Sequence, residues 1–446
     1  MNSYLKSLKL LFFLILINFQ SYSQGGLIET KEDVLKLGLE EYNADELGFS
    51  STELPNSFSM RKYAPPVKNQ EGGTCVGWAT SYSAMSIMHN VRYNITDPFV
   101  KYATAFDPYF AYSIIKQQEG DFSCDAGLYI SEAAEVLKRI GVKKWSVPPL
   151  LGCNTKWNKQ DLNTLTNYSK SFVIDKYIGI PNDNPEFIEI IKQKVFEYIP
   201  VVFVVEIGDS FQPRNEKNIS GISSNGIWNP KDNESDLEGH AMTIVGYNDY
   251  KNGGSFEVMN SWGKDFGDNG FVWIKYSDFK PRVEFGWFFV LPDEFHEDNN
   301  PTYYNDGLLR VDFTNNNTYE GQFINRNSIQ NAQWDPQNLG SEFNGFGQYL
   351  WDDNNVYSGY WNNGKQNGVG LWFKNSDYSM WWVKYDNGTF ISSEELGFSP
   401  DEQKEVNQLK EYLKIFDSEI KLNSSSEEPD IDIRSSKGIL KKMNNY

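Results

Sequence analysis

The 446-residue chain is poor in cysteine, histidine and positive charge. Its three cysteines cannot form a disulfide framework in a chain of this length. The 41 Lys and Arg residues are outnumbered by 60 Asp and Glu residues, and the formal net charge is −19. Nucleic acids and anionic membranes both attract basic residues, so the acid excess disfavours both as partners. We therefore expect no nucleic-acid binding and no strong membrane binding.

Long apolar runs are also scarce. A helix that spans a bilayer takes roughly 20 apolar residues, and the run at residues 10–17 is much shorter. The other apolar stretch, residues 199–207, is interpreted as one buried strand. The sequence is nevertheless 39% hydrophobic and 15% aromatic, which argues against disorder as its dominant state. Its length predicts two or three domains with a sizeable core.

The N-terminus indicates export. Lys6 and Lys9 precede the first apolar run, and small residues follow it around Ser21, which is the pattern of a cleaved signal peptide. Residue 24 is Gln24 rather than the cysteine of a lipid-anchored protein. A buried N-terminal helix is the alternative interpretation. We expect removal of residues 1–23 and a location outside a bacterial cell, either secreted, periplasmic or at the cell surface.

Composition and patterning divide the chain into six segments. They are a signal peptide (1–23), a short N-terminal segment (24–53), a compact domain (54–292), a linker (293–302), a repeat region (303–395) and a C-terminal segment (396–446). The short N-terminal segment contains one helical candidate over residues 32–41. The C-terminal segment contains an amphipathic helical candidate over residues 406–416, and the tail after it is expected to be disordered.

The compact domain begins with helical patterns and continues with strands. Trp78, Tyr82 and Met85 recur at helical spacing on one face. Asn184 is expected to cap a later helix with Pro185 at its first position. The remaining elements are expected to be a helix over 130–140 and strands over 201–205, 242–247, 255–259 and 270–276. Helices first and strands later predict an α+β domain of two halves.

The region after residue 303 repeats itself. Residues 319–323, 357–361 and 378–382 each begin with Tyr and end with Phe or Trp, and the last two are 21 residues apart. These units resemble MORN repeats, which implies an elongated sheet of β-hairpins. The longer first interval places an insertion at residues 329–339. The aromatic residues either fill and turn the hairpins or form a surface for a protein or glycan partner, and both interpretations stay open.

Cys75 is the candidate nucleophile. It stands at the start of a predicted helix, where unpaired backbone amides and the helix dipole favour the thiolate. A thiolate is the nucleophile that acyl transfer requires. The alternative is a buried structural cysteine, which is a common role for a lone cysteine.

His240 and Asn260 are the candidate partners of Cys75. His240 begins one predicted strand and Asn260 ends the next, so adjacent antiparallel strands would bring the two side chains together. The Asn amide can then hold the imidazole in one tautomer, as the third member of a catalytic triad does. The other two histidines, His89 and His296, are expected to be structural or solvent-facing.

Residues 54–292 resemble the papain family of cysteine peptidases over nearly their whole length. The resemblance rests on a lead-in at 66–70, a nucleophile motif at 73–75, a histidine motif at 239–247 and an Asn-Ser-Trp-Gly motif at 260–263. It implies a helical lobe and an antiparallel β lobe, followed by the all-β MORN-repeat hairpin sheet. The resemblance also implies that Cys75, His240 and Asn260 form a catalytic triad. It implies that Gln70 supplies an oxyanion donor and that Trp262 shields the His–Asn pair. Gly127 is implied to pair with the substrate backbone.

The chain departs from the family pattern in five ways, one of which is Ala126 in place of the usual second glycine of the substrate loop. Gln70 and Cys75 are five residues apart, one fewer than usual, and Val76 replaces the usual tryptophan. Gly72 stands where a cysteine is usual, which leaves the cysteine matched by Cys124 to pair elsewhere. Only 30 residues separate the expected signal peptide from the domain, so a long helical inhibitory propeptide is not expected.

Cys124 and Cys153 are the remaining cysteines. They are 29 residues apart, and a leftover pair in an exported protein tends to oxidise, so a disulfide is favoured over two free thiols. A zinc site would need further Cys or His residues close by in the sequence, and none is present. We expect neither a metal nor another cofactor.

The sequence thus predicts a secreted endopeptidase that cleaves protein or peptide substrates through an acyl-enzyme thioester. Another amide hydrolase, such as a cell-wall peptidase, is the alternative within enzymes. A catalytically weak binding protein that keeps the papain fold and displays the repeats is the alternative from a different class. The preferred substrate side chain stays open, because no motif marks the pocket that would select it.

Overall fold

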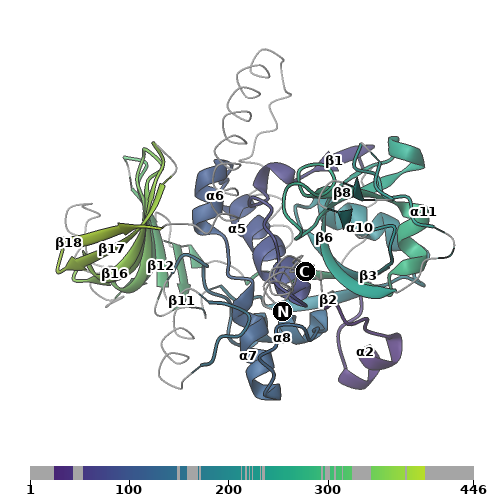
Figure 1. Cartoon of the computed structure of the whole chain (residues 1–446), viewed down its shortest axis with the longest axis horizontal. Coiled ribbons are helices and arrows are strands. Elements are labelled where there is room, and N and C mark those ends of the chain that lie inside the picture. Colours follow the sequence, from purple (N-terminus) through teal and green to yellow (C-terminus); the bar gives the residue numbers. More distant parts are fainter. Residues whose placement is uncertain are drawn as a thin grey trace, which may run out of the picture.

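The computed structural model describes residues 25–43, 54–147, 151–157, 169, 172–211, 213–215, 218–219, 221–223, 225–231, 233, 237–292, 295–296, 302–305, 308–313, 315–323, 343–376 and 379–396. The expected signal peptide, the insertion at 329–339 and the helix over 406–416 lie outside these residues. Within the described part of the chain, every helix is too short or too polar to span a membrane. Figure 1 shows a central group of helices with a β-sheet on either side.

The central helices form the helical lobe. They are α4 (Cys75–Gly77), η2 (Trp78–Met85), α5 (Ser86–Arg92), α6 (Pro98–Thr104), α7 (Tyr109–Glu119) and α8 (Ile130–Arg139). The first three form one continuous run in which η2 is a π-helix, whose wider turn alters the side-chain period. Trp78 and Tyr82 therefore pack into one hydrophobic core and Met85 packs into another, so the prediction that they share a face is wrong for Met85.

Local capping signals explain where several of these helices begin and end. The Asp97 side chain accepts the Val100 N–H at 2.9 Å, and Pro98 occupies the first position of α6. Gly120 ends α7 in the left-handed region, with φ 75°. Gly141 follows α8 with φ 84°, which agrees with the predicted end of that helix.

The predicted cap of the next helix is wrong. Helix α10 (Phe187–Phe196) begins after Glu186, so Asn184 lies two residues before the cap. The Asn184 side chain instead accepts the Glu186 N–H at 2.9 Å, which closes a turn that leads into the helix. A capping residue and a turn residue use the same short polar side chain, and the sequence pattern does not separate the two roles.

The β lobe is one antiparallel sheet in the strand order β2-β9-β3-β6-β7-β8, with β1 paired to β6. Its strands are β1 (Ser57–Ser59), β2 (Lys176–Pro181), β3 (Val201–Ile207), β6 (Glu238–Asn248), β7 (Ser255–Met259), β8 (Phe271–Lys275) and β9 (Phe285–Val290). All four strands predicted for this domain are present. Because β6 pairs with both β3 and β7, the start of β6 lies in the middle of the sheet, close to the helical lobe.

Shorter elements connect the two lobes and cover their edges. They are α2 (Lys31–Leu37), η1 (Arg61–Tyr63), β4 (Pro213–Asn215), β5 (Asn218–Ile219), η3 (Lys251–Gly253), α11 (Tyr276–Phe279) and η4 (Lys280–Arg282). The helix α2 is shorter than the expected 32–41, because Gly38 turns the chain into the left-handed region with φ 63°.

The second sheet is an antiparallel meander of nine strands in sequence order. These are β10 (Phe295–His296), β11 (Thr302–Asn305), β12 (Leu308–Asp312), β13 (Thr318–Phe323), β14 (Phe343–Leu350), β15 (Val356–Asn362), β16 (Lys365–Lys374), β17 (Ser379–Asp386) and β18 (Thr389–Glu395). Strand β10 and the start of β11 lie inside the segment expected to be a linker at 293–302. These short strands pair with the sheet even though the expected linker is mostly polar, since backbone pairing does not require apolar side chains.

The repeated Tyr-x-Gly units have a packing reason. A Cβ on Gly347 would lie 2.6 Å from the Tyr319 hydroxyl, and a Cβ on Gly359 would lie 2.5 Å from the Tyr357 hydroxyl. Each tyrosine ring therefore lies flat over glycines of its own and the neighbouring strand. The Tyr319 hydroxyl donates to the Gln322 carbonyl at 2.8 Å, which satisfies the buried polar end of the ring.

One face of the second sheet packs on the helical lobe. Phe99 and Tyr102 of α6 meet the Phe373 ring of β16, with centroid distances of 6.1 and 6.3 Å. The buried hydroxyls of Ser146 and Ser358 lie 3.1 Å apart across the same interface. The helical lobe is thus the common support of both sheets, as Figure 1 also shows.

Candidate active site

Cys75 is the first residue of α4, and its side chain is fully buried. The turn before it approaches a neighbouring loop closely. Gly73 donates its N–H to the Cys124 carbonyl at 2.7 Å, and a Cβ on Gly73 would lie 2.4 Å from the Asp125 carbonyl oxygen, so this position needs glycine. The Cys75 sulfur accepts the N–H of Ala241 at 3.4 Å. The residue after His240 is therefore in contact with the candidate nucleophile.

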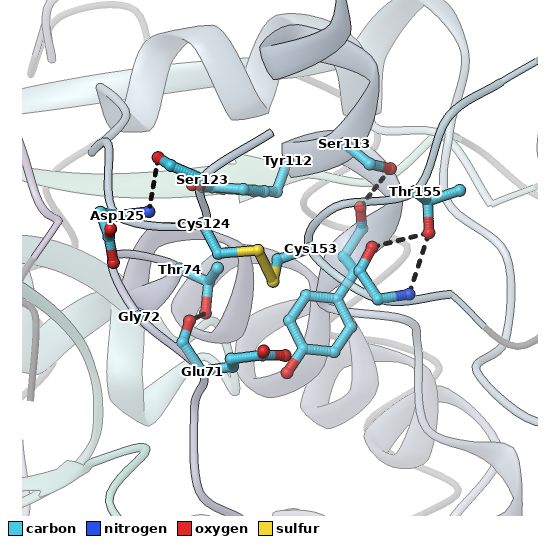
Figure 2. The surroundings of a disulfide bond; sticks show 12 residues. Glu71, Gly72, Thr74, Tyr112, Ser113, Ser123, Cys124, Asp125, Cys153 and Thr155 are labelled. Atoms are coloured by element: carbon cyan, nitrogen blue, oxygen red, sulfur yellow. Dashed lines mark hydrogen bonds between the residues drawn. A yellow bond between two sulfur atoms is a disulfide. The ribbon is translucent and has the colours of Figure 1, made fainter. Parts of the chain in front are cut away.

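A disulfide braces this turn. Cys124 and Cys153 are bonded, with their Cα atoms 5.5 Å apart, and Figure 2 shows the bond beside Glu71 and Thr74. The Thr74 hydroxyl donates to the Glu71 carbonyl at 2.7 Å and closes the turn from the other side. The Glu71 carboxylate and the two sulfurs lie close together. Because both sulfurs are oxidised, they cannot act as thiolate ligands, and the group does not fit a metal ion.

His240 and Asn260 meet across β6 and the end of β7, and both are buried. His240 Nε2 lies 2.7 Å from Asn260 Oδ1, which also accepts the Ser261 N–H at 2.8 Å. Since an amide oxygen only accepts, Nε2 carries the ring proton and Nδ1 is the basic nitrogen. The Trp262 ring stacks on the imidazole with centroids 4.6 Å apart. The structure thus places an orienting amide and a covering indole on the same histidine.

Burial sets the ionisation of both candidate catalytic groups. Burial raises the pKa of the Cys75 thiol to about 11, and backbone N–H groups, that of Ala241 foremost, offset only part of this rise. Burial also lowers the pKa of His240 to about 4, against a smaller opposite effect of the Asn260 hydrogen bond. The expectation that the helix start favours a thiolate is therefore wrong for this state, because loss of water outweighs the helix amides. Thiol and imidazole are both neutral here.

Gln70 lies beside the triad candidates, but its amide is engaged. Its Nε2 donates to the Gly72 carbonyl at 2.7 Å, and its Oε1 accepts the Ser261 hydroxyl at 2.7 Å. Because Gln70 precedes Cys75 by only five positions, the turn between them folds back and brings the Gly72 carbonyl to the Gln70 amide. The side chain must leave the Gly72 carbonyl before Nε2 can bind an oxyanion.

The cleft between the two lobes is occupied by residues 25–28, which we call the strap. Gly26 donates its N–H to the Gly239 carbonyl at 3.1 Å, and Leu27 donates to the Leu128 carbonyl at 2.9 Å. Gly127, the expected substrate subsite, lies against the strap, since a Cβ there would be 2.2 Å from the Gly25 carbonyl oxygen. The strap therefore covers the wall on which a substrate chain was expected to pair.

Sequence reasoning missed the strap and also Phe211. The Phe211 ring lies 6.2 Å from the His240 ring and 5.5 Å from the Trp262 ring and helps to exclude water from the imidazole. An isolated phenylalanine carries no motif that would have marked it. The adjacent glycines Gly25 and Gly26 are a detectable signal, because two glycines in succession permit a close approach between backbones.

Comparisons with known proteins identify the family of residues 54–283. The sequence model of the family described as "Papain family cysteine protease" matches residues 54–283. Zingipain-2 of Zingiber officinale is 24% identical over 228 residues, which is 49% of this chain and 87% of that protein. An uncharacterised peptidase C1-like protein of Acanthamoeba polyphaga mimivirus is 36% identical over 90 residues. That match spans 20% of this chain and only 26% of the viral protein.

Two solved structures are similar to this chain at low identity. Xylellain, a cysteine protease from Xylella fastidiosa, is 20% identical to this chain, with a TM-score of 0.48. The match covers 61% of this chain and 98% of the xylellain chain. Digestive procathepsin L 3 from the larval midgut of Tenebrio molitor is 17% identical to this chain, with a TM-score of 0.44. The match covers 61% of this chain and 78% of the procathepsin chain.

Proposed function

Since the chain belongs to the papain family of cysteine proteases, we propose that it hydrolyses peptide bonds with Cys75 as nucleophile, His240 as general base and Asn260 as orienting residue. The observation that carries this proposal is the 2.7 Å contact between His240 Nε2 and Asn260 Oδ1 beside a fully buried free thiol. That contact leaves His240 Nδ1 as the basic ring nitrogen. The next residue, Ala241, donates its N–H to the Cys75 sulfur, so the histidine lies close to the thiol.

The reaction follows from this arrangement. His240 Nδ1 takes the Cys75 proton, and the sulfur attacks the carbonyl carbon of the scissile bond. The developing oxyanion is bound by the Cys75 N–H and by Gln70 Nε2 once that amide has left Gly72, with each donor contributing about 3 kcal/mol. The imidazolium then protonates the leaving amine, and water hydrolyses the thioester. Asn260 holds the ring throughout, so that one nitrogen faces the sulfur at both steps.

The proposal is tested by prolonged incubation with a thiol-directed epoxide peptide inhibitor, followed by mapping of the adduct. One adduct on Cys75 is expected, because Cys124 and Cys153 are joined in a disulfide and have no thiolate. Labelling that proceeds at the same rate in Cys75→Ala would place the reactive group elsewhere and contradict the proposal.

Asn260→Ala is expected to lower kcat by about a hundred-fold without abolishing hydrolysis, because misorientation costs part of the general-base contribution while the thiol and the oxyanion donors remain. The measurement is steady-state hydrolysis of a fluorogenic peptide, with the midpoint of thermal unfolding as the control for folding. A loss as complete as that of Cys75→Ala would show that Asn260 does more than orient the histidine.

The partly exposed aromatic side chains of the second sheet support a binding role separate from catalysis. We propose that the protein is exported after removal of residues 1–23 and that residues 303–395 form a MORN-repeat sheet. This sheet presents Trp and Tyr side chains to a protein or glycan partner. Tyr349, Trp351 and Trp372 form a partly exposed row on the face opposite α6, with successive ring centroids 4.6 and 4.8 Å apart.

One observation favours a second candidate function. The Gln70 amide is hydrogen-bonded to the Gly72 carbonyl and the Ser261 hydroxyl. An oxyanion donor engaged in this way would suit a catalytically weak protein that binds peptides in its cleft. The two candidates differ in turnover. A peptidase releases product repeatedly after its cleft is opened, whereas a weak binding protein would take up a peptide and release it uncut.

A further inference from the structure

Glu71, Cys124 and Cys153 bring three metal-ligating groups together beside the turn of the candidate nucleophile. One carboxylate oxygen and the two sulfurs all lie within 4.8 Å of one another. Both cysteines are buried and Glu71 is exposed, so the group has the protein on one side and solvent on the other. Figure 2 shows the Glu71 side chain beside the disulfide. An ion bound here could keep a water ligand on its solvent side.

The segment that carries Cys153 is fixed by contacts that do not involve its sulfur. The Trp157 N–H donates to Gln117 Oε1 at 2.5 Å, and the Trp157 indole N–H donates to the Ser113 hydroxyl at 3.1 Å. Gln117 and Ser113 both belong to α7, which is part of the helical lobe. We therefore expect Cys153 to stay in place when its bond to the other sulfur is opened.

The segment that carries Cys124 is fixed in the same way. Before it, the Ser123 N–H donates to Asp121 Oδ1 at 2.9 Å. After it, the Tyr112 hydroxyl donates to the Ala126 carbonyl at 2.8 Å. Opening the disulfide would thus leave two neighbouring thiols rather than two separated ones. A site whose ligands are held in advance binds a metal ion without first having to order the chain.

Two thiolates and a carboxylate form a set of ligands that zinc accepts, and water would complete the tetrahedron. Zn–S bonds of about 2.3 Å hold two sulfurs about 3.8 Å apart. The Cα atoms of the two cysteines are 5.5 Å apart, which permits this separation after a rotation of the side chains. Calcium and magnesium prefer oxygen ligands alone, so the two sulfurs select zinc over these ions.

We propose that Glu71, Cys124 and Cys153 form a zinc site once the disulfide has been reduced. In the disulfide the sulfurs carry no negative charge, so the group fits a metal ion only in the reduced protein. Sequence reasoning expected no metal, because no further Cys or His lies near the cysteine pair. The third ligand is instead a carboxylate that lies 53 positions before Cys124 in the chain.

The reductant in this proposal is a dithiol. One thiolate of the dithiol attacks a protein sulfur and breaks the S–S bond, and its second thiol then displaces the mixed disulfide. The dithiol leaves as a cyclic disulfide, and its two protons remain with Cys124 and Cys153. Zinc binding then releases both protons, because the ligands are thiolates.

The zinc site would keep the nucleophile turn braced under reducing conditions. Cys124 has φ 69°, a left-handed conformation that is unfavourable for a residue with a Cβ, and its carbonyl accepts the Gly73 N–H at 2.7 Å. The disulfide holds this conformation in the oxidised protein. The proposed reaction needs Cys75 as a free thiol, and the dithiols that protect a free thiol also open the disulfide. In this respect the inference rests on the proposed function.

The first experiment measures metal binding by the full-length Cys75→Ala protein, so that the catalytic thiol supplies no ligand. The protein is reduced with dithiothreitol, separated from it by anaerobic gel filtration and titrated with Co²⁺ and then with Zn²⁺. One Co²⁺ ion per chain should bind, with sulfur-to-cobalt charge-transfer absorption, and Zn²⁺ should displace it. The oxidised protein should show no such absorption, because it has no thiolate to offer.

Glu71→Gln in the same background should weaken Co²⁺ binding by at least about ten-fold, because it removes an anionic ligand and leaves both thiolates. Glu119→Gln, at the exposed end of α7, is the matched control and should bind like its parent. The thermal unfolding midpoint of each oxidised variant checks folding. Absorption that is absent from the reduced parent, or unchanged in Glu71→Gln, would overturn the proposed site.

The second experiment follows hydrogen–deuterium exchange of the Gly73 amide, whose N–H is bonded to the Cys124 carbonyl. Exchange should be about ten-fold faster in the reduced, metal-free protein than in the oxidised protein. Zn²⁺ should restore slow exchange in the reduced parent but not in Glu71→Gln. Fast exchange that Zn²⁺ leaves unchanged would contradict the role of the metal as a brace. Neither measurement involves a substrate, so failure here would not count against the proposed hydrolysis, which inhibitor labelling tests separately.

Discussion

Replacement of Cys75 by alanine is expected to lower peptide hydrolysis by at least about 10⁵-fold, since removal of the nucleophile of a triad costs nearly as much as removal of the whole triad. His240 and Asn260 would remain in place, but no other described cysteine carries a free thiol beside them. The substitution removes one small buried side chain and leaves the braced turn with its glycines intact, so the fold should persist.

The measurement is steady-state hydrolysis of a fluorogenic peptide by the full-length protein. Leu35→Ala, which changes an exposed residue of α2, is the control for a substitution outside the site. Far-ultraviolet circular dichroism and the thermal unfolding midpoint should be unchanged. Activity that stays within a few-fold of the Cys75 parent would assign the chemistry to another residue.

The second large effect is expected at Glu320, which joins the second sheet to the helical lobe. Its carboxylate is buried, lies 3.0 Å from His89 Nε2 and forms an ion pair with Lys144 Nζ. Burial alone would raise the pKa of Glu320, but the charges of Lys144 and Arg310 and the hydrogen bond from His89 hold it well below its ordinary value. The carboxylate is thus ionised and compensates buried positive charge in the interface.

Glu320→Ala should therefore lower the free energy of unfolding by about 3–5 kcal/mol, because it leaves the buried Lys144 ammonium without its partner. Denaturant unfolding followed by tryptophan fluorescence measures this loss. Glu394→Ala in the exposed strand β18 is the matched control, and a change within about 0.5 kcal/mol is expected there. An equally small change for Glu320→Ala would mean that the interface does not depend on the ion pair.

The same cluster explains the role of His89. Sequence reasoning expected this histidine to be structural or solvent-facing, and the structure places it in the buried interface against Glu320. Burial lowers its pKa to about 4, so it is neutral in this position and serves as a hydrogen-bonding partner. Its contact is 231 residues away along the chain, which no local pattern could indicate.

The candidate site shows which parts of a site can be predicted from sequence. The prediction that His240 and Asn260 would lie side by side needed only two antiparallel strands joined by a short turn, and the two side chains are 2.7 Å apart. The position of Cys75 at a helix start also follows from local signals. The ionisation of the thiol could not be predicted, since it depends on burial by residues 50 positions earlier in the chain. The engagement of Gln70 depends on Ser261 in the same way.

The sequence by itself determined the family, the order of the candidate triad, the helix over 130–140, the strands over 201–205, 242–247 and 255–259, and the spacing of the repeats. These depend on short-range rules of capping, periodicity and motif spacing. Only the tertiary structure decided that residues 25–28 close the cleft, that Glu320 ties the second sheet to the helical lobe, and that the thiol is neutral. These depend on burial and on contacts between distant segments, whose free energies arise when the chain is packed.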